Sequence, residues 1–324
     1  MLDASDTSGS SNLMQEGFTA KSAAIVIFAY NRVDRLQGLI ESLEGCREFR
    51  TSPVRIYVDG PRNVTDATKV NDVVGYLSRI DHPNAKIVRR DTNFGLRKSI
   101  HSGVGEVLNE YDRVVVLEDD LVVSPDILAY FNAALEKYES YSNVYSVCAY
   151  TPVTKRISSN SRSLILPSTH PWGWATWRRA WLGFDLGLPV RREDILSPSF
   201  RIAFNLSGYR DYTSMLRLTA QGRLDSWFLI WNYFVFMERG VSIFPPRPLV
   251  ANAGFSEGTH SSRWNVLRHF YKQTPPARFD FELPFDTRVD YWAIDCLAHS
   301  REAWLSLITT KAGIIKRVLR DRRL

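Results

Sequence analysis

Cysteine is scarce in this sequence, which contains only Cys46, Cys148 and Cys296 among 324 residues. An odd number of widely spaced cysteines excludes a disulfide framework and offers no cluster for a zinc site. The scarcity is typical of a protein that works in a reducing compartment, and we therefore expect a cytoplasmic location.

The sequence also lacks long apolar runs. No segment approaches the roughly 20 apolar residues that a membrane-spanning helix needs. Residues 1–20 are polar, and they include no apolar stretch of the kind that signal peptides carry. We expect a disordered tail there.

Basic residues gather at the C-terminal end, within a chain whose net charge is +6. As a helix, Lys311–Leu324 would place Ile314, Ile315 and Val318 beside a row of Lys and Arg side chains. Such a helix could lie on the anionic inner face of a membrane, or it could stay solvated, and both alternatives remain open. Elsewhere no basic stripe carries interleaved aromatic residues, so we expect no nucleic-acid partner.

Strand and helix patterns alternate through the first 150 residues. The predicted strands are Ala23–Tyr30, Val54–Asp59, Ala85–Arg90, Arg113–Leu117 and Val144–Tyr150. Leu, Ile and Val at helical spacing predict helices at Arg35–Leu43, Val70–Leu77 and Leu96–Leu108. The alternation predicts an α/β fold with a mainly parallel, Rossmann-like central sheet flanked by helices.

Beyond residue 150 the pattern is looser. Strands are predicted at Leu164–Pro167 and Val241–Phe244, a strongly aromatic helix at Asp225–Glu238, and a Gly-rich loop at Asn252–His260. These later elements predict a smaller second region attached to the sheet.

Four tryptophans crowd the stretch from His170 to Trp181. Trp174, Trp177 and Trp181 follow helical spacing, which favours an aromatic core helix. The alternative is a sugar pocket, because Trp faces pack against sugar rings and Gly173 lets the backbone approach a ligand. We interpret Trp177 and Trp181 as core and Trp172–Trp174 as pocket.

Polar residues follow three of the predicted strands: Asn31-Arg32, Asp59 and the triplet Glu118-Asp119-Asp120. Parallel α/β sheets bind ligands at the carboxyl ends of their strands. Three adjacent carboxylates repel one another, and a divalent cation turns that cost into binding. Hard oxygen ligands suit Mn²⁺ or Mg²⁺. A solvated acidic turn is the alternative.

The position of the triplet favours the metal site. It follows a buried strand and precedes a predicted helix with Ser124 as its N-cap and Pro125 at its first position. The surrounding segment, Val115 to Phe131 (VVLEDDLVVSPDILAYF), resembles the acidic motif of N-acetylglucosaminyltransferase I and its bacterial relatives. This resemblance implies an inverting GT-A glycosyltransferase that uses a nucleotide-sugar donor and manganese, and it extends over roughly residues 23 to 262.

The resemblance also implies roles for single residues. Asp120 would bind the metal ion, and Glu118 and Asp119 would contact the donor sugar and ribose. Asp225, in the segment Leu224–Trp227, would be the catalytic base. The remaining donor contacts would be Tyr30 and Arg32 at the nucleotide, Asp59 at the uracil, Trp172, Gly173 and Trp174 in the sugar pocket, and His260 in a loop that closes over the diphosphate.

Asp225 has two interpretations from its neighbours alone. Burial against Leu224 and Trp227 would raise its pKa toward a range that suits a general base. An ordinary helix N-cap is the alternative, since Asp is favoured at that position. Three other acids, Asp185, Asp211 and Glu257, remain candidates for the base.

Together these features predict four segments. They are a tail at 1–20, a nucleotide-sugar-binding half at 21–150, an acceptor and catalytic-base half of the same GT-A domain at 151–275, and a C-terminal extension with the basic helix at 276–324. The resemblance implies transfer of a hexose or N-acetylhexosamine, from a donor that is expected to be a UDP-sugar, to a glycan or glycolipid in bacterial polysaccharide biosynthesis.

Two alternative functions remain. A nucleotidyltransferase has a similar sheet, but it usually carries a Gly-rich phosphate loop after the first strand, where this chain reads AYNRVDR. A non-catalytic carbohydrate-binding protein would not need acids at each strand end.

Overall fold

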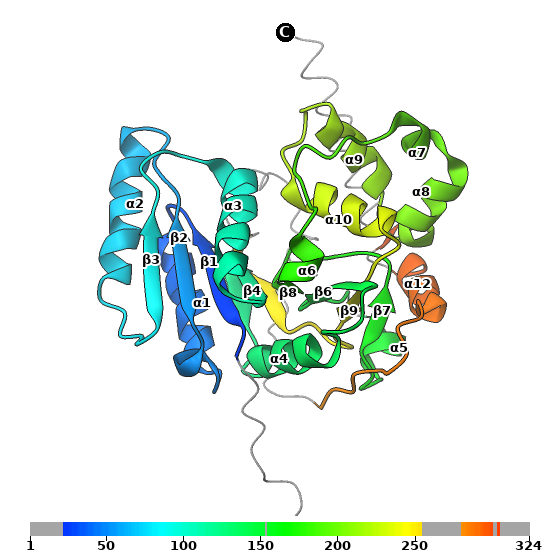
Figure 1. The fold of residues 1–324 in the computed structure, drawn as a ribbon, viewed down its shortest axis with the longest axis horizontal. Helices are drawn as coiled ribbons and strands as arrows, with labels where there is room; N and C mark the ends of the chain where they lie inside the picture. The colour runs from blue at the N-terminus through cyan, green and yellow to red at the C-terminus, as the bar shows by residue number, and fades with distance from the viewer. Residues whose placement is uncertain (1–21, 153, 255–279, 301–302, 305–324) are drawn as a thin grey trace, which may run out of the picture.

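The computed structural model describes residues 22–152, 154–254, 280–300 and 303–304 (Figure 1). Its centre is an eight-stranded sheet with the order β3-β2-β1-β4-β8-β6-β9-β7. The strands are β1 (Ala24–Ala29), β2 (Val54–Val58), β3 (Ala85–Arg89), β4 (Arg113–Glu118), β6 (Val144–Cys148), β7 (Leu164–Leu166), β8 (Trp174–Trp177) and β9 (Val241–Phe244).

The sheet is mainly parallel. β1 pairs in parallel with β2 and with β4, β2 with β3, and β6 with β9. Antiparallel pairing is confined to β8, between β4 and β6, and to β7 at the edge. The predicted α/β class is therefore confirmed, and β4 and β6 are joined through a strand from the second half of the chain.

Helices cover both faces of the sheet because its central strands are apolar on both sides. Ile25 and Ile27 of β1 pack with α1, α2 and α4, whereas Val26 and Phe28 pack with α3 and α10. The helices are α1 (Val33–Glu44), α2 (Val64–Leu77), α3 (Gly95–Glu110), α4 (Ile127–Lys137), α5 (Lys155–Ser158), α6 (Arg178–Trp181), α7 (Arg192–Leu196), α8 (Pro198–Phe204), α9 (Tyr212–Ala220), α10 (Trp227–Met237) and α12 (Tyr291–Ala298), with 3₁₀ turns at Phe49–Thr51 and Leu206–Gly208.

The structure corrects two predicted elements. The Trp-rich stretch is strand β8 followed by the single turn α6, because Trp174–Trp177 completes the sheet between β4 and β6. The helix after the triplet begins at Ile127 with Asp126 as its N-cap, and the Ser124 hydroxyl accepts only a 3.4 Å hydrogen bond from the Asp126 amide.

A second, two-stranded sheet includes the residues just before that helix, which therefore begins later than predicted. β5 (Leu121–Val123) follows the triplet and pairs antiparallel with β10 (Val250–Asn252). The pairing places Val250–Asn252 beside the residues that directly follow β4. It therefore determines what surrounds the triplet.

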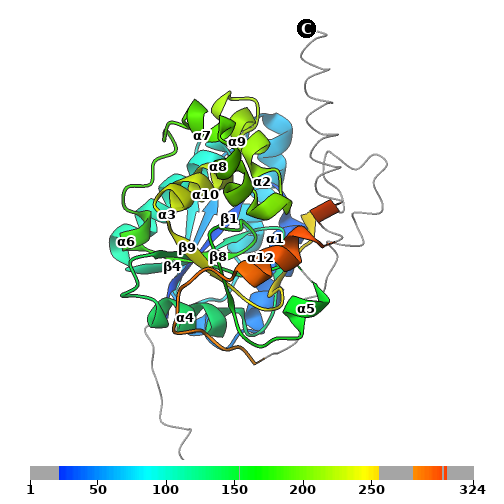
Figure 2. The same cartoon turned by 90° about the vertical axis from the view of Figure 1, so that its right-hand side faces the viewer.

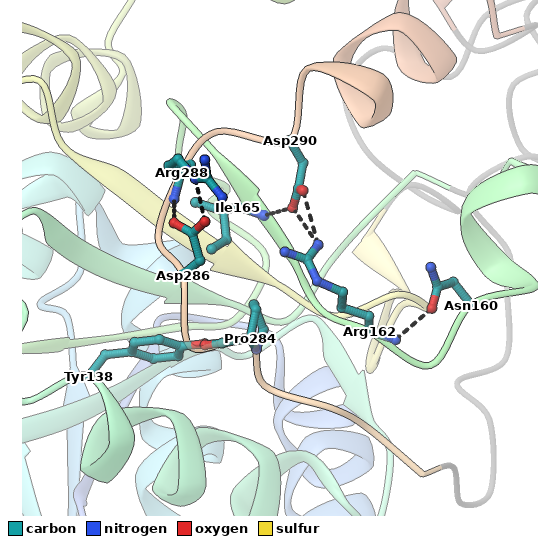
Figure 3. A network of polar contacts seen from close by, with 8 residues as sticks. All are labelled: Tyr138, Asn160, Arg162, Ile165, Pro284, Asp286, Arg288 and Asp290. Carbon is teal, nitrogen blue, oxygen red and sulfur yellow. Dashed lines mark hydrogen bonds and ion pairs between the residues drawn. The ribbon is translucent and has the colours of Figure 1, made fainter.

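Residues 280–290 form a strap along the β7 edge of the sheet (Figure 3). The Asp290 carboxylate, 8% exposed, accepts two 2.9 Å hydrogen bonds from Arg162 and one of 2.8 Å from the Ile165 amide. Earlier in the strap, the Pro284 carbonyl accepts a 2.6 Å hydrogen bond from the hydroxyl of Tyr138, the C-cap residue of α4. The strap leads into α12, which lies beside α5 (Figure 2).

Two predicted features lie outside the described residues: the tail at 1–20 and the basic helix at Lys311–Leu324. Within the described residues, none of the helices has the length and apolar character that crossing a membrane requires.

Candidate active site

The acidic triplet lies where β4 ends, beside the end of β1. The Asp119 amide donates to the Phe28 carbonyl at 3.0 Å, which continues the parallel pairing by one residue. The side chain of Asp119 is 4% exposed and that of Asp120 is 15% exposed. From the loop after β1, Arg32 Nη2 contacts Asp119 Oδ1 and lies 3.3 Å from Asp120 Oδ2. The predicted convergence of Arg32 with the triplet is observed.

The triplet carries more negative charge than Arg32 balances. Burial raises the pKa of Glu118, and the charges of Asp120 and Asp119 raise it further. Burial also raises the pKa of Asp119, to about 6, although the Arg32 guanidinium lowers it. Upward shifts in both carboxyl groups mean that the cluster would gain from further positive charge.

β10 brings polar groups to the other side of Asp120. The Asp120 carbonyl accepts a 2.7 Å hydrogen bond from the Ala253 amide, and Asn252 Nδ2 lies 3.4 Å from Asp120 Oδ1. A Cβ built on Gly254 would be 2.3 Å from Asp120 Oδ2, so any other residue at position 254 would displace the Asp120 carboxylate from its observed position. The sequence suggested a Gly-rich loop here, but it did not identify Asn252 or Gly254 as neighbours of the triplet.

A side-chain clamp holds the loop after β1. Asp66, in the first turn of α2, accepts hydrogen bonds from the Tyr30 hydroxyl at 2.7 Å and from Asn31 Nδ2 at 3.0 Å. The backbone amide of Tyr30 in turn binds the Asp119 carboxylate. Tyr30 is thus beside the triplet, as predicted. The residue that fixes its side chain, Asp66, had no signal in the sequence beyond its place at a helix start.

The Asp59 carboxylate, at the end of β2, makes hydrogen bonds to other groups of the protein. Its carboxylate accepts hydrogen bonds from the amides of Gly60, Phe94 and Gly95 at 2.8–3.0 Å, and from Asn93 Nδ2 at 3.1 Å. These contacts tie β2 to the start of α3. The carboxylate is 8% exposed and both of its oxygens are engaged, so reading a base would require one of these bonds to be exchanged.

The segment before β8 lies beside the triplet through its backbone. Gly173 has a φ of +67°, and a Cβ there would lie 3.2 Å from Val250 of β10 and 3.4 Å from Leu117 of β4. Trp172 is partly buried and forms an aromatic group with Tyr150 and His170, with ring centroids 4.7 and 5.2 Å away. Gly173 and Trp172 therefore stand at the carboxyl edge of the sheet, as expected.

Trp174 does not line an open pocket. It is 1% exposed and stacks between Trp181 and Trp227, with centroid distances of 5.6 and 5.3 Å. The prediction that Trp174 contacts the sugar is wrong. Side chains alternate between the two faces of a strand, and that of Trp174 points into the core on the face of the sheet that α3 and α10 cover. Trp177 and Trp181 are core residues, as predicted.

Asp225 is exposed, immediately before α10. The expected burial against Leu224 and Trp227 is not observed, and neither is the N-cap role, because Ser226 caps the helix by accepting from the Leu229 amide at 3.4 Å. The first turn of α10 does reach the aromatic group: Phe228 lies 6.4 Å from His170 between ring centroids. Further along α10, Asn232 Oδ1 accepts the Thr169 amide at 2.7 Å.

The other candidate acids have structural roles or lie outside the description. Asp211 caps α9 through the Ser214 amide at 3.2 Å, and Asp185 accepts the Gly187 amide at 2.9 Å. Glu257 and His260 lie outside the described residues. Within the described ranges, no three His, Cys, Asp or Glu side chains converge in the manner of a preformed metal cage.

The GNT-I family model matches residues 6–182, more than half of the chain. The chain therefore belongs to the GNT-I family, and the resemblance to N-acetylglucosaminyltransferase I is confirmed. That family defines it as a glycosyltransferase with an α/β fold. A bacterial type stays a prediction.

Solved structures with similar folds include a mannosyltransferase from Pyrobaculum calidifontis in complex with GDP-Man and Mn²⁺. It is 15% identical with a TM-score of 0.43, and the match covers 91% of this chain and 81% of that one. Another is TarS residues 1–349 from S. aureus in complex with UDP, which is 14% identical with a TM-score of 0.33. That match covers 59% of this chain and 55% of the other. No curated protein matches the sequence.

Proposed function

We propose that this glycosyltransferase transfers a sugar from a nucleoside-diphosphate donor to a glycan or glycolipid hydroxyl, with inversion at the anomeric carbon and with a divalent cation at Asp120. The observation that carries the proposal is the under-neutralised triplet at the end of β4, enclosed by Arg32 on one side and by Asn252 and Gly254 on the other.

The residues around Asp120 fit a hard cation. Carboxylate and amide oxygens are the ligands that Mn²⁺ and Mg²⁺ take in proteins. The Asn252 side-chain oxygen lies beside Gly254, close to the Asp120 carboxylate, and is a further oxygen that could bind such an ion. Such an ion, when bound, supplies positive charge to the leaving diphosphate as a Lewis acid.

The chain's own residues would do the rest. Arg32 would meet the diphosphate, since a guanidinium binds phosphate oxygens in a paired, charge-assisted geometry. Trp172 would place its ring against the transferred sugar. Glu118 and Asp119 would accept hydrogen bonds from sugar and ribose hydroxyls. Asp59 would face the base only by exchanging an internal hydrogen bond.

Asp225 would act as the general base on the acceptor hydroxyl. Its exposure before α10 leaves it accessible to an acceptor, and the first turn of that helix contacts the aromatic group around Trp172. Deprotonation there and departure of the diphosphate on the triplet side would give in-line displacement, hence inversion. In this scheme residues 21–150 form the donor half, 151–275 the acceptor half and 276–324 the extension, and the central sheet takes strands from both halves.

UDP as the nucleotide, a hexose or N-acetylhexosamine as the sugar, and a role in bacterial polysaccharide synthesis are parts of the proposal that rest on the family. Work at the cytoplasmic side of a membrane, held by the basic helix at Lys311–Leu324, is a further part. GDP-Man is bound with Mn²⁺ in the Pyrobaculum mannosyltransferase, and UDP is bound in TarS. GDP-mannose and UDP-sugars are therefore included among the donors to screen.

The test combines a donor screen with one variant. The protein is incubated with Mn²⁺ and a panel of UDP- and GDP-sugars, and free nucleotide is measured. Slow donor hydrolysis without acceptor supports the proposal, and inertness toward every donor would favour a binding protein. In a parallel incubation with a nucleoside triphosphate and a sugar 1-phosphate, release of pyrophosphate would indicate nucleotidyl transfer. Asp120→Ala should abolish Mn²⁺-dependent donor binding; unchanged UDP affinity would remove Asp120 from the site.

A further inference from the structure

Arg32 occupies the position where the proposed function requires a cation. Among the ion pairs of the described residues, Arg32 alone reaches the triplet, and one nitrogen, Nη2, serves both Asp119 Oδ1 and Asp120 Oδ2. A divalent ion bound by Asp120 would have to share that carboxylate with a guanidinium. Two positive charges at hydrogen-bonding distance from one oxygen pair repel, so they compete for the site.

The two partners differ in their freedom to move. The acid side chains are 4% and 15% exposed, and the backbone that carries them is fixed by hydrogen bonds to Phe28 and Ala253, whereas the Arg32 side chain is 43% exposed. Arg32 is the N-cap residue of α1 but makes no capping hydrogen bond with its side chain. Its guanidinium can therefore leave the carboxylates without breaking secondary structure.

We propose that Arg32 is a resident counter-ion of the triplet, which a divalent cation displaces only when a nucleoside diphosphate arrives to receive the guanidinium. The inference rests on the proposed metal and donor site. It adds that metal and nucleotide bind together, and that free metal alone binds weakly because the Arg32 guanidinium already occupies the oxygens of Asp119 and Asp120.

The physical basis is an exchange of ion pairs. Before the exchange Arg32 pairs with carboxylates, and afterwards it pairs with phosphate oxygens, to which guanidinium binds at least as well. Metal alone at Asp120 would place a second cation beside Arg32 and leave Asp119 as its only anionic partner, so the two positive charges would repel each other across the shared carboxylates. Metal and nucleotide together satisfy every charge, which makes their binding cooperative.

The experiment measures Mn²⁺ binding to the full-length protein from the electron paramagnetic resonance signal of free Mn²⁺, with and without UDP. Arg32→Gln removes the competitor, and we expect it to bind Mn²⁺ alone about 10-fold more tightly than the wild type, the factor that one charge-assisted hydrogen bond supplies. In the same variant, UDP affinity at saturating Mn²⁺ should fall, and UDP should tighten Mn²⁺ binding less than it does in the wild type, because only the direct contact of the cation with the diphosphate remains.

Two further variants distinguish the effect of a positive charge at position 32 from the effect of the protein's overall charge. Arg32→Lys keeps a cation and should bind Mn²⁺ alone nearly as weakly as the wild type. Arg50→Gln removes an exposed positive charge before the amino end of β2, near Asp81, and should change neither measurement. Should Arg32→Gln fail to fold, Arg32→Met replaces the charge with an apolar chain of comparable reach.

A thermal melt gives a second readout. Mn²⁺ alone should raise the melting temperature of Arg32→Gln, whose acids lack a counter-ion, and should leave the wild type nearly unchanged. Equal affinity of wild type and Arg32→Gln for free Mn²⁺ would overturn the inference. Failure of the wild type to bind Mn²⁺ even with saturating UDP would instead count against the proposed function, so the two failures are distinguishable.

Discussion

At the scale of single residues, Asp225 is where chemistry and structure can be separated most directly. Its side chain is exposed and does not cap α10, so replacing it should leave the fold intact. We expect Asp225→Asn to keep donor affinity and to lower turnover by about 10² or more, the usual contribution of a general base.

Steady-state kinetics with donor and acceptor varied separately measures this effect. Asp185→Asn is the matched control, because Asp185 is also exposed and binds only the Gly187 amide of its own turn. Full turnover in Asp225→Asn would leave Asp225 with neither a cap nor a catalytic role.

Gly254 tests the space beside Asp120. Because a Cβ at Gly254 would lie 2.3 Å from Asp120 Oδ2, Gly254→Ala must shift that carboxylate. Displacement of a site group by about 1 Å commonly costs up to 10²-fold, so we expect Mn²⁺-dependent UDP affinity to fall about 10- to 100-fold.

Isothermal titration with UDP in the presence of Mn²⁺ checks this prediction. Gly75→Ala in α2 is the control, since a Cβ there has no atom within 4 Å. Wild-type affinity in Gly254→Ala would show that Asp120 does not hold the cation in the observed position.

At the scale of elements, the junction of β2 and α3 depends on Asp59. Its carboxylate satisfies the amides of Gly60, Phe94 and Gly95. Asp59→Ala would leave these donors without their partner, and we expect the free energy of unfolding to fall by about 2–4 kcal/mol.

Urea denaturation gives that free energy. Asp91→Ala, an exposed acid two residues before Asn93, is the control and should be nearly neutral. If Asp59→Ala instead kept wild-type stability while losing UDP affinity, base recognition would be the residue's main role.

The elements that local pattern determines were predictable from the sequence. β1 is an apolar run buried on both faces, β2, β4 and β6 are mostly apolar and mostly buried, and α1 and α3 keep their buried Leu, Ile and Val at helical spacing. β8 was not predictable, because Trp174, Trp177 and Trp181 satisfy helical spacing and only pairing with β4 and β6 makes Trp174–Trp177 a strand.

The residues of the site were likewise predictable only where the order of strands along the chain places them. The triplet and Arg32 follow strand ends, which chain order alone brings to one edge of a parallel sheet. Asn252 and Gly254 reach Asp120 only through the β5–β10 pairing, more than 130 residues along the chain. Asp66, in α2, reaches Tyr30, after β1, although α1 and β2 separate the two residues along the chain. Such contacts depend on tertiary geometry, which periodicity does not contain.

At the scale of the whole molecule, the strap at 280–290 connects α12 and α4 to the β7 edge of the sheet, remote from Asp120 along the strand order. Asp290→Ala would leave the Arg162 guanidinium, 30% exposed, without its carboxylate and the Ile165 amide without its acceptor. Breaking a buried pair costs 3–5 kcal/mol, and partial exposure of Arg162 reduces this to about 2–3 kcal/mol.

Stability and donor binding should therefore separate in this variant. Asp290→Ala should lower the midpoint of a single cooperative unfolding transition, because the strap joins helices to a sheet that also carries the triplet, while UDP affinity at saturating Mn²⁺ stays at the wild-type value. Asp286→Ala is the control, since its partner Arg288 is 90% exposed and surface pairs contribute little. A loss of UDP affinity at temperatures where Asp290→Ala is fully folded would mean that the strap acts on the site, whereas an early, separate transition would mean that residues beyond 280 unfold independently of the sheet.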